Sequence, residues 1–182
     1  ELLKQLCEIV GPHRNVNYDG LWNVYKDSDI RPGTNYYWDM YSTSKFREGQ
    51  QKCGNYSHVG DCVNREHSFP KSWFKEGQPM KSDAFHVYPT DGKVNGQRSN
   101  YPYGECANGT TLPSSNGVDA LGKLGKSTFP GYSGTVFEPV DEYKGDFARS
   151  YFYMAACYND KIASWSSPML AGNSYPCYTT WA

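Results

Sequence analysis

The residues best suited to chemistry gather between positions 64 and 105. This segment contains the adjacent pair Glu66-His67 and a second histidine, His86, in a chain with four histidines in total. A carboxylate or an imidazole can ligate a divalent cation, and a free imidazole can move a proton near neutral pH. The pattern predicts metal-assisted hydrolysis, with His67 handling the proton and Glu66 and His86 holding the cation.

The charge pattern of the same segment indicates an anionic substrate. Lys and Arg outnumber Asp and Glu between Arg65 and Arg98, although the whole chain has a formal net charge of −1. Phosphate binding requires local cations rather than a basic protein. We therefore expect a phosphodiester, in which a neutral histidine takes a proton from the attacking water and contributes about 10²–10⁴-fold. The cation would stabilise the departing oxygen.

The site must be positioned by short elements. Glu66 and His67 would face opposite sides of a regular strand, so we expect the turn at Ser68-Phe69-Pro70 to bring them together. Helical spacing and turn residues predict short helices at 1–10 and 18–27, a strand at 62–67 and a core helix at 141–158. Irregular structure is expected at 31–62, a helix of one or two turns after Asp83, a helical piece at 93–100 and surface loops at 107–135.

Length and composition fit one α+β domain over residues 1–182, without a transmembrane segment. The six cysteines form no CxxC pair, which disfavours a zinc ribbon and favours disulfides in an oxidising compartment. Cys53 and Cys62 are close enough to clip one loop. A secreted or periplasmic protein is expected, whose signal peptide has already been removed.

Three blocks in order carry a family resemblance. They are NREHSFPKSWF from Asn64, SDAFHVYPTDGKVNGQRSNYPYGE from Ser82 and GYSGTVFEPVDEYKGDFARSYFYMA from Gly131. Together they closely resemble the bacterial endonuclease I family of His-Me finger (ββα-metal) nucleases. The resemblance implies a ββα-metal core at about residues 60–100, with added helices and long loops, clipped by disulfides. It also implies a magnesium-dependent, largely sequence-nonspecific endonuclease that leaves 5′-phosphate ends.

The resemblance assigns roles residue by residue. His67 takes the place of the general base and Glu66 that of a ligand to one divalent cation. The second ligand position, Asn in many relatives, is His86 in DAFHVYP. Imidazole is a competent ligand that favours softer ions, so Mn²⁺ stays an alternative to Mg²⁺. Relatives usually continue beyond this chain's end with a further segment rich in Arg and Asn. The resemblance implies that this segment forms part of the substrate-binding surface.

Substrate contacts are less sharply assigned. Some relatives carry a phosphate-binding arginine in the loop after the Glu-His pair, where this chain has only lysines. The candidates for phosphate or substrate binding are Arg98, Asn95, Lys71 and Lys75. Asn95 and Arg98 would bind metal-bound water and phosphate respectively, or hold the turn together. DNA is the expected partner, with RNA as an alternative, bound through the backbone by a monomer with little sequence preference.

Other readings of these residues remain open. His67 alone would suit a surface turn, and His86 alone a hydrogen-bonded core position. Glu66 would suit a solvated carboxylate or a partner of Arg65. From a different class, a secreted binding module for polysaccharide or nucleic acid would explain the abundant Tyr and Trp without catalysis. Such a module would still bind its ligand after a chelator had removed divalent metal ions. An inactive nuclease fold is a further alternative, and a zinc hydrolase is disfavoured because HExxH is absent.

Overall fold

The computed structural model describes residues 2–172 and 177–182, and it combines helices with two small antiparallel sheets. This confirms the α+β prediction. The helices and strands are α1 (Leu2–Val10), α2 (Leu21–Ser28), β1 (Val63–His67), β2 (Val87–Asp91), α3 (Gly92–Arg98), β3 (Cys106–Thr110), β4 (Lys123–Ser127), β5 (Thr135–Glu138) and α4 (Asp141–Cys157). The short 3-10 helices are η1 (Lys71–Phe74), η2 (Met80–Ser82) and η3 (Ile162–Ser164). Among the described residues, no helix combines the length and apolar character needed to cross a membrane.

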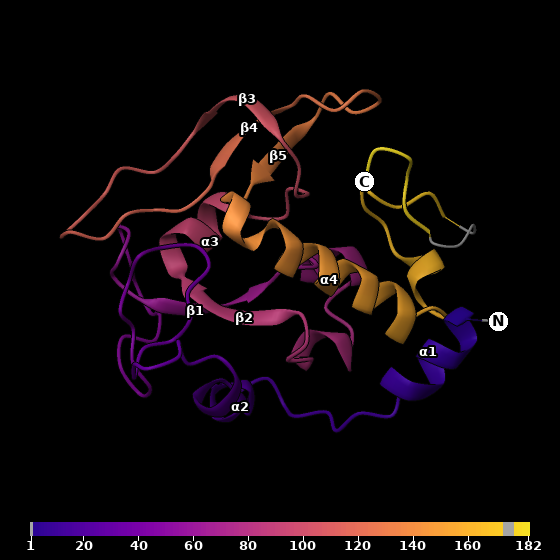
Figure 1. Cartoon of the computed structure of the whole chain (residues 1–182), viewed down its shortest axis with the longest axis horizontal. Coiled ribbons are helices and arrows are strands. Elements are labelled where there is room, and N and C mark those ends of the chain that lie inside the picture. The colour runs from indigo at the N-terminus through magenta and orange to yellow at the C-terminus, as the bar shows by residue number, and fades with distance from the viewer. Residues whose placement is uncertain (1, 173–176) are drawn as a thin grey trace.

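Helix α4 is the central element, and it runs between the β3–β4–β5 sheet and the β1–β2 pair (Figure 1). Two acidic residues occupy its first turn, where they complement the helix dipole. Its buried face divides between two hydrophobic clusters: Phe147 packs into one, and Tyr151 and Met154 into the other. The helix predicted at 141–158 is thus confirmed. Phe152, on the outer face of the same helix, is 70% exposed.

The β1–β2 pair leads directly into α3. The register places His67 opposite Val87 and Val63 opposite Asp91. The strand predicted at 62–67 is confirmed as β1, and the helical piece predicted at 93–100 corresponds to α3. The helix expected after Asp83 is wrong. Asp83 ends η2 and its Oδ1 accepts from the Phe85 backbone N–H at 3.0 Å, after which the chain extends as β2.

The sequence predicted surface loops at 107–135, but this region also contains strands. It contributes to a three-stranded sheet in which β4 lies between β3 and β5. The register places Lys126 opposite Ala107 on one side and opposite Thr135 on the other. The glycines in β3 and β4 gave no strand pattern in the sequence, and in the structure they allow the two strands to pack closely. A Cβ at Gly125 would lie 2.9 Å from the Gly109 Cα atom.

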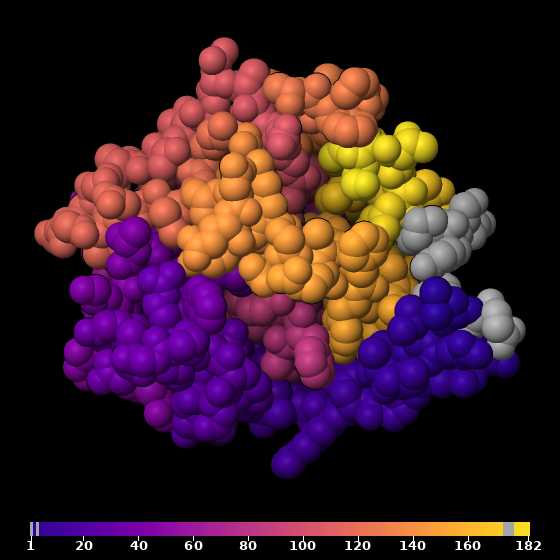
Figure 2. Space-filling model, viewed as in Figure 1, coloured from indigo at the N-terminus to yellow at the C-terminus, as the bar shows by residue number. Residues whose placement is uncertain are grey.

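The two ends of the chain lie on one side of the molecule. Helices α1 and α2 confirm the predicted N-terminal helices, and α1 packs against the C-terminal half of α4 (Figure 1). Figure 2 shows the N-terminal residues (indigo) and the C-terminal residues (yellow) along the same edge, beside the end of α4.

The cysteines divide into one disulfide and four free thiols. Cys53 and Cys62 form the disulfide, which confirms the clipped loop. The free thiols belong to Cys7, Cys106, Cys157 and Cys177. The general expectation of disulfides is therefore met at a single pair.

Candidate active site

A cavity of about 400 Å³ opens where β1 ends, beside α3 and η1. Its volume falls in the range of small-molecule and substrate sites. The cavity brings Glu66, His67, Asn95 and Lys71 together, from segments that only the fold makes neighbours. The full lining is Tyr18, Asn64, Arg65, Glu66, His67, Pro70, Lys71, Ser72, Glu76, Asn95, Ser99 and Asn100.

Helix α3 is fixed at its start by two local devices. The Asp91 carboxylate caps the helix by accepting from the backbone N–H groups of Lys93 and Val94, at 2.8 and 3.0 Å. Gly92 then lies against the disulfide, so a side chain there would collide with Cys53 Sγ. The disulfide and the cap thereby set the position of Asn95 one turn later.

Glu66 is held by a buried arginine and a buried tyrosine. Its Oε1 accepts from Arg98 Nη1 at 2.5 Å and from the Tyr41 hydroxyl at 2.8 Å. Burial raises the pKa of Glu66, and the Arg98 guanidinium, which does not deprotonate in proteins, opposes that rise. The Tyr103 side chain also stabilises this carboxylate and lowers its pKa, and Glu66 lines the cavity.

Arg98 is fully buried and its donors are taken by the protein. Besides Glu66, it donates to the backbone carbonyls of His67 at 2.7 Å, Ser68 at 2.6 Å and Tyr101 at 3.1 Å. Its guanidinium also lies 4.3 Å from the centre of the Tyr103 ring. The structure therefore places Arg98 behind Glu66, away from the cavity lining.

The environment of His67 selects one tautomer. His67 Nε2 lies 2.9 Å from the carbonyl oxygen of Lys81, and a carbonyl oxygen can only accept. Nε2 must therefore carry the hydrogen, which leaves the lone pair of the neutral ring on Nδ1. Burial lowers the pKa of His67 to about 3, and nearby cations such as Lys71 add to this effect. The ring is accordingly neutral at physiological pH, and Tyr18 stacks on it with centroids 5.9 Å apart.

His86 is placed beside His67 but outside the cavity lining. It is fully buried, and its Nε2 lies 2.7 Å from the Met80 carbonyl, which fixes its tautomer in the same way. Its Nδ1 is buried without a hydrogen-bond partner in the described chain, and burial lowers its pKa. The two rings, 5.8 Å apart, thus donate to successive carbonyls of η2.

The remaining predicted substrate residues take different positions. Asn95 is partly exposed in the cavity, and among the described residues its side-chain amide has no hydrogen-bond partner. Lys71 also lines the cavity and pairs with Glu76 at 2.8 Å, an acid that Lys81 contacts from the other side at 2.7 Å. Lys75 is exposed outside the lining.

Sequence reasoning missed the tyrosines that shape the site. Tyr41 donates to Glu66, and its hydroxyl lies 2.6 Å from that of Tyr103. Tyr18 covers His67, and the Arg65 guanidinium lies 3.6 Å from the Tyr18 ring centre. With 16 tyrosines in the chain, no sequence signal distinguishes these three.

Known proteins resemble this chain along most of its length. The family model described as Endonuclease I matches residues 1–182. The chain belongs to the endonuclease I family. It is similar to the extracellular ribonucleases of Bacillus amyloliquefaciens and Bacillus subtilis (strain 168), with 31% identity to each. These alignments cover 93% and 92% of the chain.

The chain spans about half the length of these relatives, 57% and 56% respectively. It is also 31% identical to Endonuclease-1 of Buchnera aphidicola subsp. Acyrthosiphon pisum (strain APS), over 47% of the chain and 30% of the relative. Relatives of this endonuclease I chain thus carry both ribonuclease and endonuclease names.

Proposed function

We propose that the chain is a divalent-metal-dependent endonuclease that hydrolyses DNA or RNA backbones with His67 as general base. The observation that carries the proposal is the contact between His67 Nε2 and the Lys81 carbonyl. It leaves Nδ1 as the basic atom of a neutral ring, in the same cavity as Glu66 and Asn95.

The donor set in the cavity fits a hard divalent cation. The Glu66 carboxylate and the Asn95 side-chain oxygen are ligands of the kind that Mg²⁺ accepts. When bound, the cation would polarise the phosphodiester and stabilise charge on the leaving oxygen. We propose Glu66 and Asn95 as its ligands, with β1, β2 and α3 forming the ββα-metal core. His86, the second ligand expected from sequence, is the less favoured alternative because it lies outside the lining.

The protein's own groups account for the proton step. Nδ1 of His67 takes a proton from the water that attacks phosphorus, while the Lys81 carbonyl keeps Nε2–H in place. Breaking the bond to the 3′ oxygen leaves a 5′-phosphate end. Arg65 and Lys71 on the cavity wall supply positive charge for the backbone, which predicts contacts with little sequence preference.

Two observations support an extracytoplasmic setting, which we also propose. The Bacillus relatives are named extracellular ribonucleases, and the Cys53–Cys62 disulfide suits an oxidising compartment. The ribonuclease names make RNA a substrate to be tested equally with DNA.

The test is digestion of plasmid DNA and of folded RNA with Mg²⁺, Mn²⁺ or EDTA. We expect metal-dependent, distributed cleavage, and a loss of about 10²–10⁴-fold in His67→Ala. His58→Ala is the matched control, because His58 has a 69% exposed side chain. Full activity of His67→Ala would remove the general base from the proposal. No cleavage by the folded chain with any metal, together with nucleic-acid binding that survives EDTA, would favour a binding module.

A metal titration separates the two second-ligand candidates. Asn95→Ala should raise the Mg²⁺ concentration for half-maximal activity by at least about 10-fold, in the range seen when metal-site partners are lost. His86→Asn should leave that concentration nearly unchanged while lowering thermal stability. The reverse pattern would assign the ligand role to His86.

A further inference from the structure

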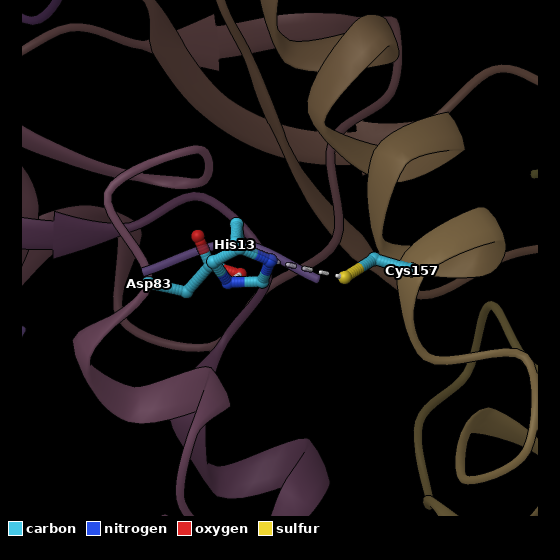
Figure 3. Close-up of side chains that lie close together, drawn as sticks. All are labelled: His13, Asp83 and Cys157. Atoms are coloured by element: carbon cyan, nitrogen blue, oxygen red, sulfur yellow. Dashed lines mark hydrogen bonds and ion pairs between the residues drawn. The ribbon is translucent and has the colours of Figure 1, made fainter. Parts of the chain in front are cut away.

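A second cluster of metal-ligating side chains lies apart from the cavity, between the N-terminal segment and the end of α4. It consists of His13, Asp83 and Cys157 (Figure 3), and one ligand atom from each lies within 4.8 Å of the other two. Three segments far apart in sequence meet here: the turn after α1, the residue that ends η2, and the last residue of α4.

His13 is oriented like a metal ligand. Its Nδ1 lies 3.1 Å from the Val10 carbonyl, so Nδ1 carries the hydrogen and the lone pair belongs to Nε2. Such an N–H to carbonyl contact is the usual support of a histidine that binds metal through its other nitrogen. His13 Nε2 is buried without a hydrogen bond among the described residues, 3.4 Å from Asp83 Oδ2. A lone pair facing a carboxylate oxygen is stable only if a proton or a cation lies between them.

The carboxylate is equally well supported. Asp83 is almost fully buried, and its Oδ2 accepts from the hydroxyl groups of Tyr153 at 2.7 Å and Tyr158 at 2.5 Å. Two neutral donors orient the group without neutralising it. Hydrogen bonds of this kind from surrounding residues are typical of carboxylates that bind metal.

Cys157 is the third member of the cluster, and its thiol is not needed for an ion pair between His13 and Asp83. Its Sγ lies 3.8 Å from His13 Nδ1, the nitrogen that donates to Val10, so a cation held by Nε2 requires the Cys157 side chain to turn toward that atom. Burial raises the pKa of this thiol, so it is protonated unless a cation binds it. Tetrahedral Zn²⁺ with nitrogen, oxygen and sulfur ligands holds them about 3.4–3.6 Å apart. One ring nitrogen of His13 lies within 4.8 Å of the other two ligand atoms, and a separation at that limit needs to close by about 1 Å.

We propose that His13, Asp83 and Cys157 form a binding site for a borderline-soft divalent cation such as Zn²⁺. The mixed nitrogen, oxygen and sulfur donors distinguish it from the oxygen ligands of the cavity, which suit Mg²⁺. With three protein ligands, the site keeps a fourth position for water. Cation binding joins the segment after α1 to α4 and to η2, whose Lys81 carbonyl holds His67. The site rests on these contacts alone and does not depend on the proposed nuclease function.

Co²⁺ is the probe, because its visible absorption reports tetrahedral geometry and its thiolate charge-transfer band reports a sulfur ligand. The variant Asn95→Ala serves as background for the Co²⁺ and Tm measurements, to weaken cation binding in the cavity without breaking the buried Glu66–Arg98 pair. Nuclease activity is measured in the otherwise wild-type chain. We expect one Co²⁺ per chain, with a thiolate band that Zn²⁺ abolishes by displacement. At 100 times its Kd, Zn²⁺ should raise Tm by about 5–10 °C.

Two cysteine substitutions make the matched comparison. Cys157→Ser should abolish the thiolate band, lose most of the Zn²⁺-dependent rise in Tm, and retain Mg²⁺-dependent activity. Cys7→Ser removes a neighbouring thiol that is not a member of the cluster, and should retain the band.

Three results would overturn the proposal. They are less than half an equivalent of Co²⁺ bound, a thiolate band that survives Cys157→Ser, or a disulfide between Cys7 and Cys157 found by peptide mapping of the native protein. Loss of nuclease activity alone would leave it unaffected, since the readouts are spectroscopic and thermal.

Discussion

Replacing Arg98 by Met tests whether this residue holds Glu66 or binds substrate. The guanidinium is fully buried and donates to Glu66 and to three backbone carbonyls. Removing one partner of a buried ion pair leaves the other charge uncompensated and costs about 3–5 kcal/mol. Against a total stability of about 5–15 kcal/mol this is a large loss. It corresponds to a fall in Tm of about 6–20 °C for a chain of this size.

The assay is thermal and urea unfolding followed by circular dichroism. Arg149→Met is the matched control, because Arg149 forms an exposed pair with Asp146 worth at most about 1 kcal/mol. The double substitution Glu66→Gln, Arg98→Met should recover part of the loss, since it removes the orphaned charge. A Tm for Arg98→Met within about 2 °C of wild type would refute this reasoning. If affinity for nucleic acid also fell, Arg98 would regain the phosphate-binding role expected from sequence.

Three further predictions follow from buried or constrained groups. Folding depresses the pKa of His67 from 6.5 to about 3, so between these pH values the unfolded chain binds a proton that the folded chain does not. The contribution of His67 to the free energy of unfolding is therefore fully present above pH 6.5 and is lost as the pH falls toward 3. The change in unfolding free energy from pH 7 to pH 5, measured with urea, should differ by about 2 kcal/mol between wild type and His67→Gln. The total change also contains Asp29 and Asp39, whose pKa values burial raises to about 6 and about 7 and which act in the opposite direction. Asp91→Ala removes the α3 cap and should cost about 0.5–2 kcal/mol by urea unfolding, whereas a cost near zero would contradict the capping role. Replacing Cys53 and Cys62 by Ser opens a loop with a sequence separation of 9 and should cost about 2–3 kcal/mol; an unchanged melt under reducing and oxidising conditions would count against it.

The sequence predicted the elements whose own pattern specifies them. Helix α4 repeats its buried residues with helical spacing, among them Phe147, Tyr151 and Met154. The strand at the Glu66-His67 pair and the loop clipped by Cys53 and Cys62 were equally local signals. In each case the information lies within one short segment.

The elements that were missed depend on distant partners. A short helix was expected after Asp83, but the structure has strand β2 there, with Pro89 opposite Arg65. A two-stranded sheet consists of edges, where proline is tolerated. Strands β3 and β4 lack apolar alternation, and Gly125 is packed closely against Gly109 and Cys106 of the neighbouring strand. Such strands are specified by packing rather than by their own residues.

The site was predicted in its residue types and only partly in its arrangement. Glu66 and His67 line one cavity as expected, but the partners that orient them come from elsewhere. Arg98 reaches Glu66 across 32 residues because α3 folds back along β1, which no spacing rule encodes. The roles of Asn95 and His86 as ligands are predictions that the metal titration will decide.

The contact between His67 and Lys81 has an evolutionary consequence. The atom that selects the tautomer of His67 is a main-chain carbonyl, which every amino acid possesses. Residue 81 can therefore change its side chain during divergence without altering which ring nitrogen is basic. The Lys81 side chain serves a different purpose, an ion pair with Glu76, and can be lost or replaced independently. A library of substitutions at position 81 should consequently be far more permissive than one at Gly77 or Pro79, which precede it in the chain.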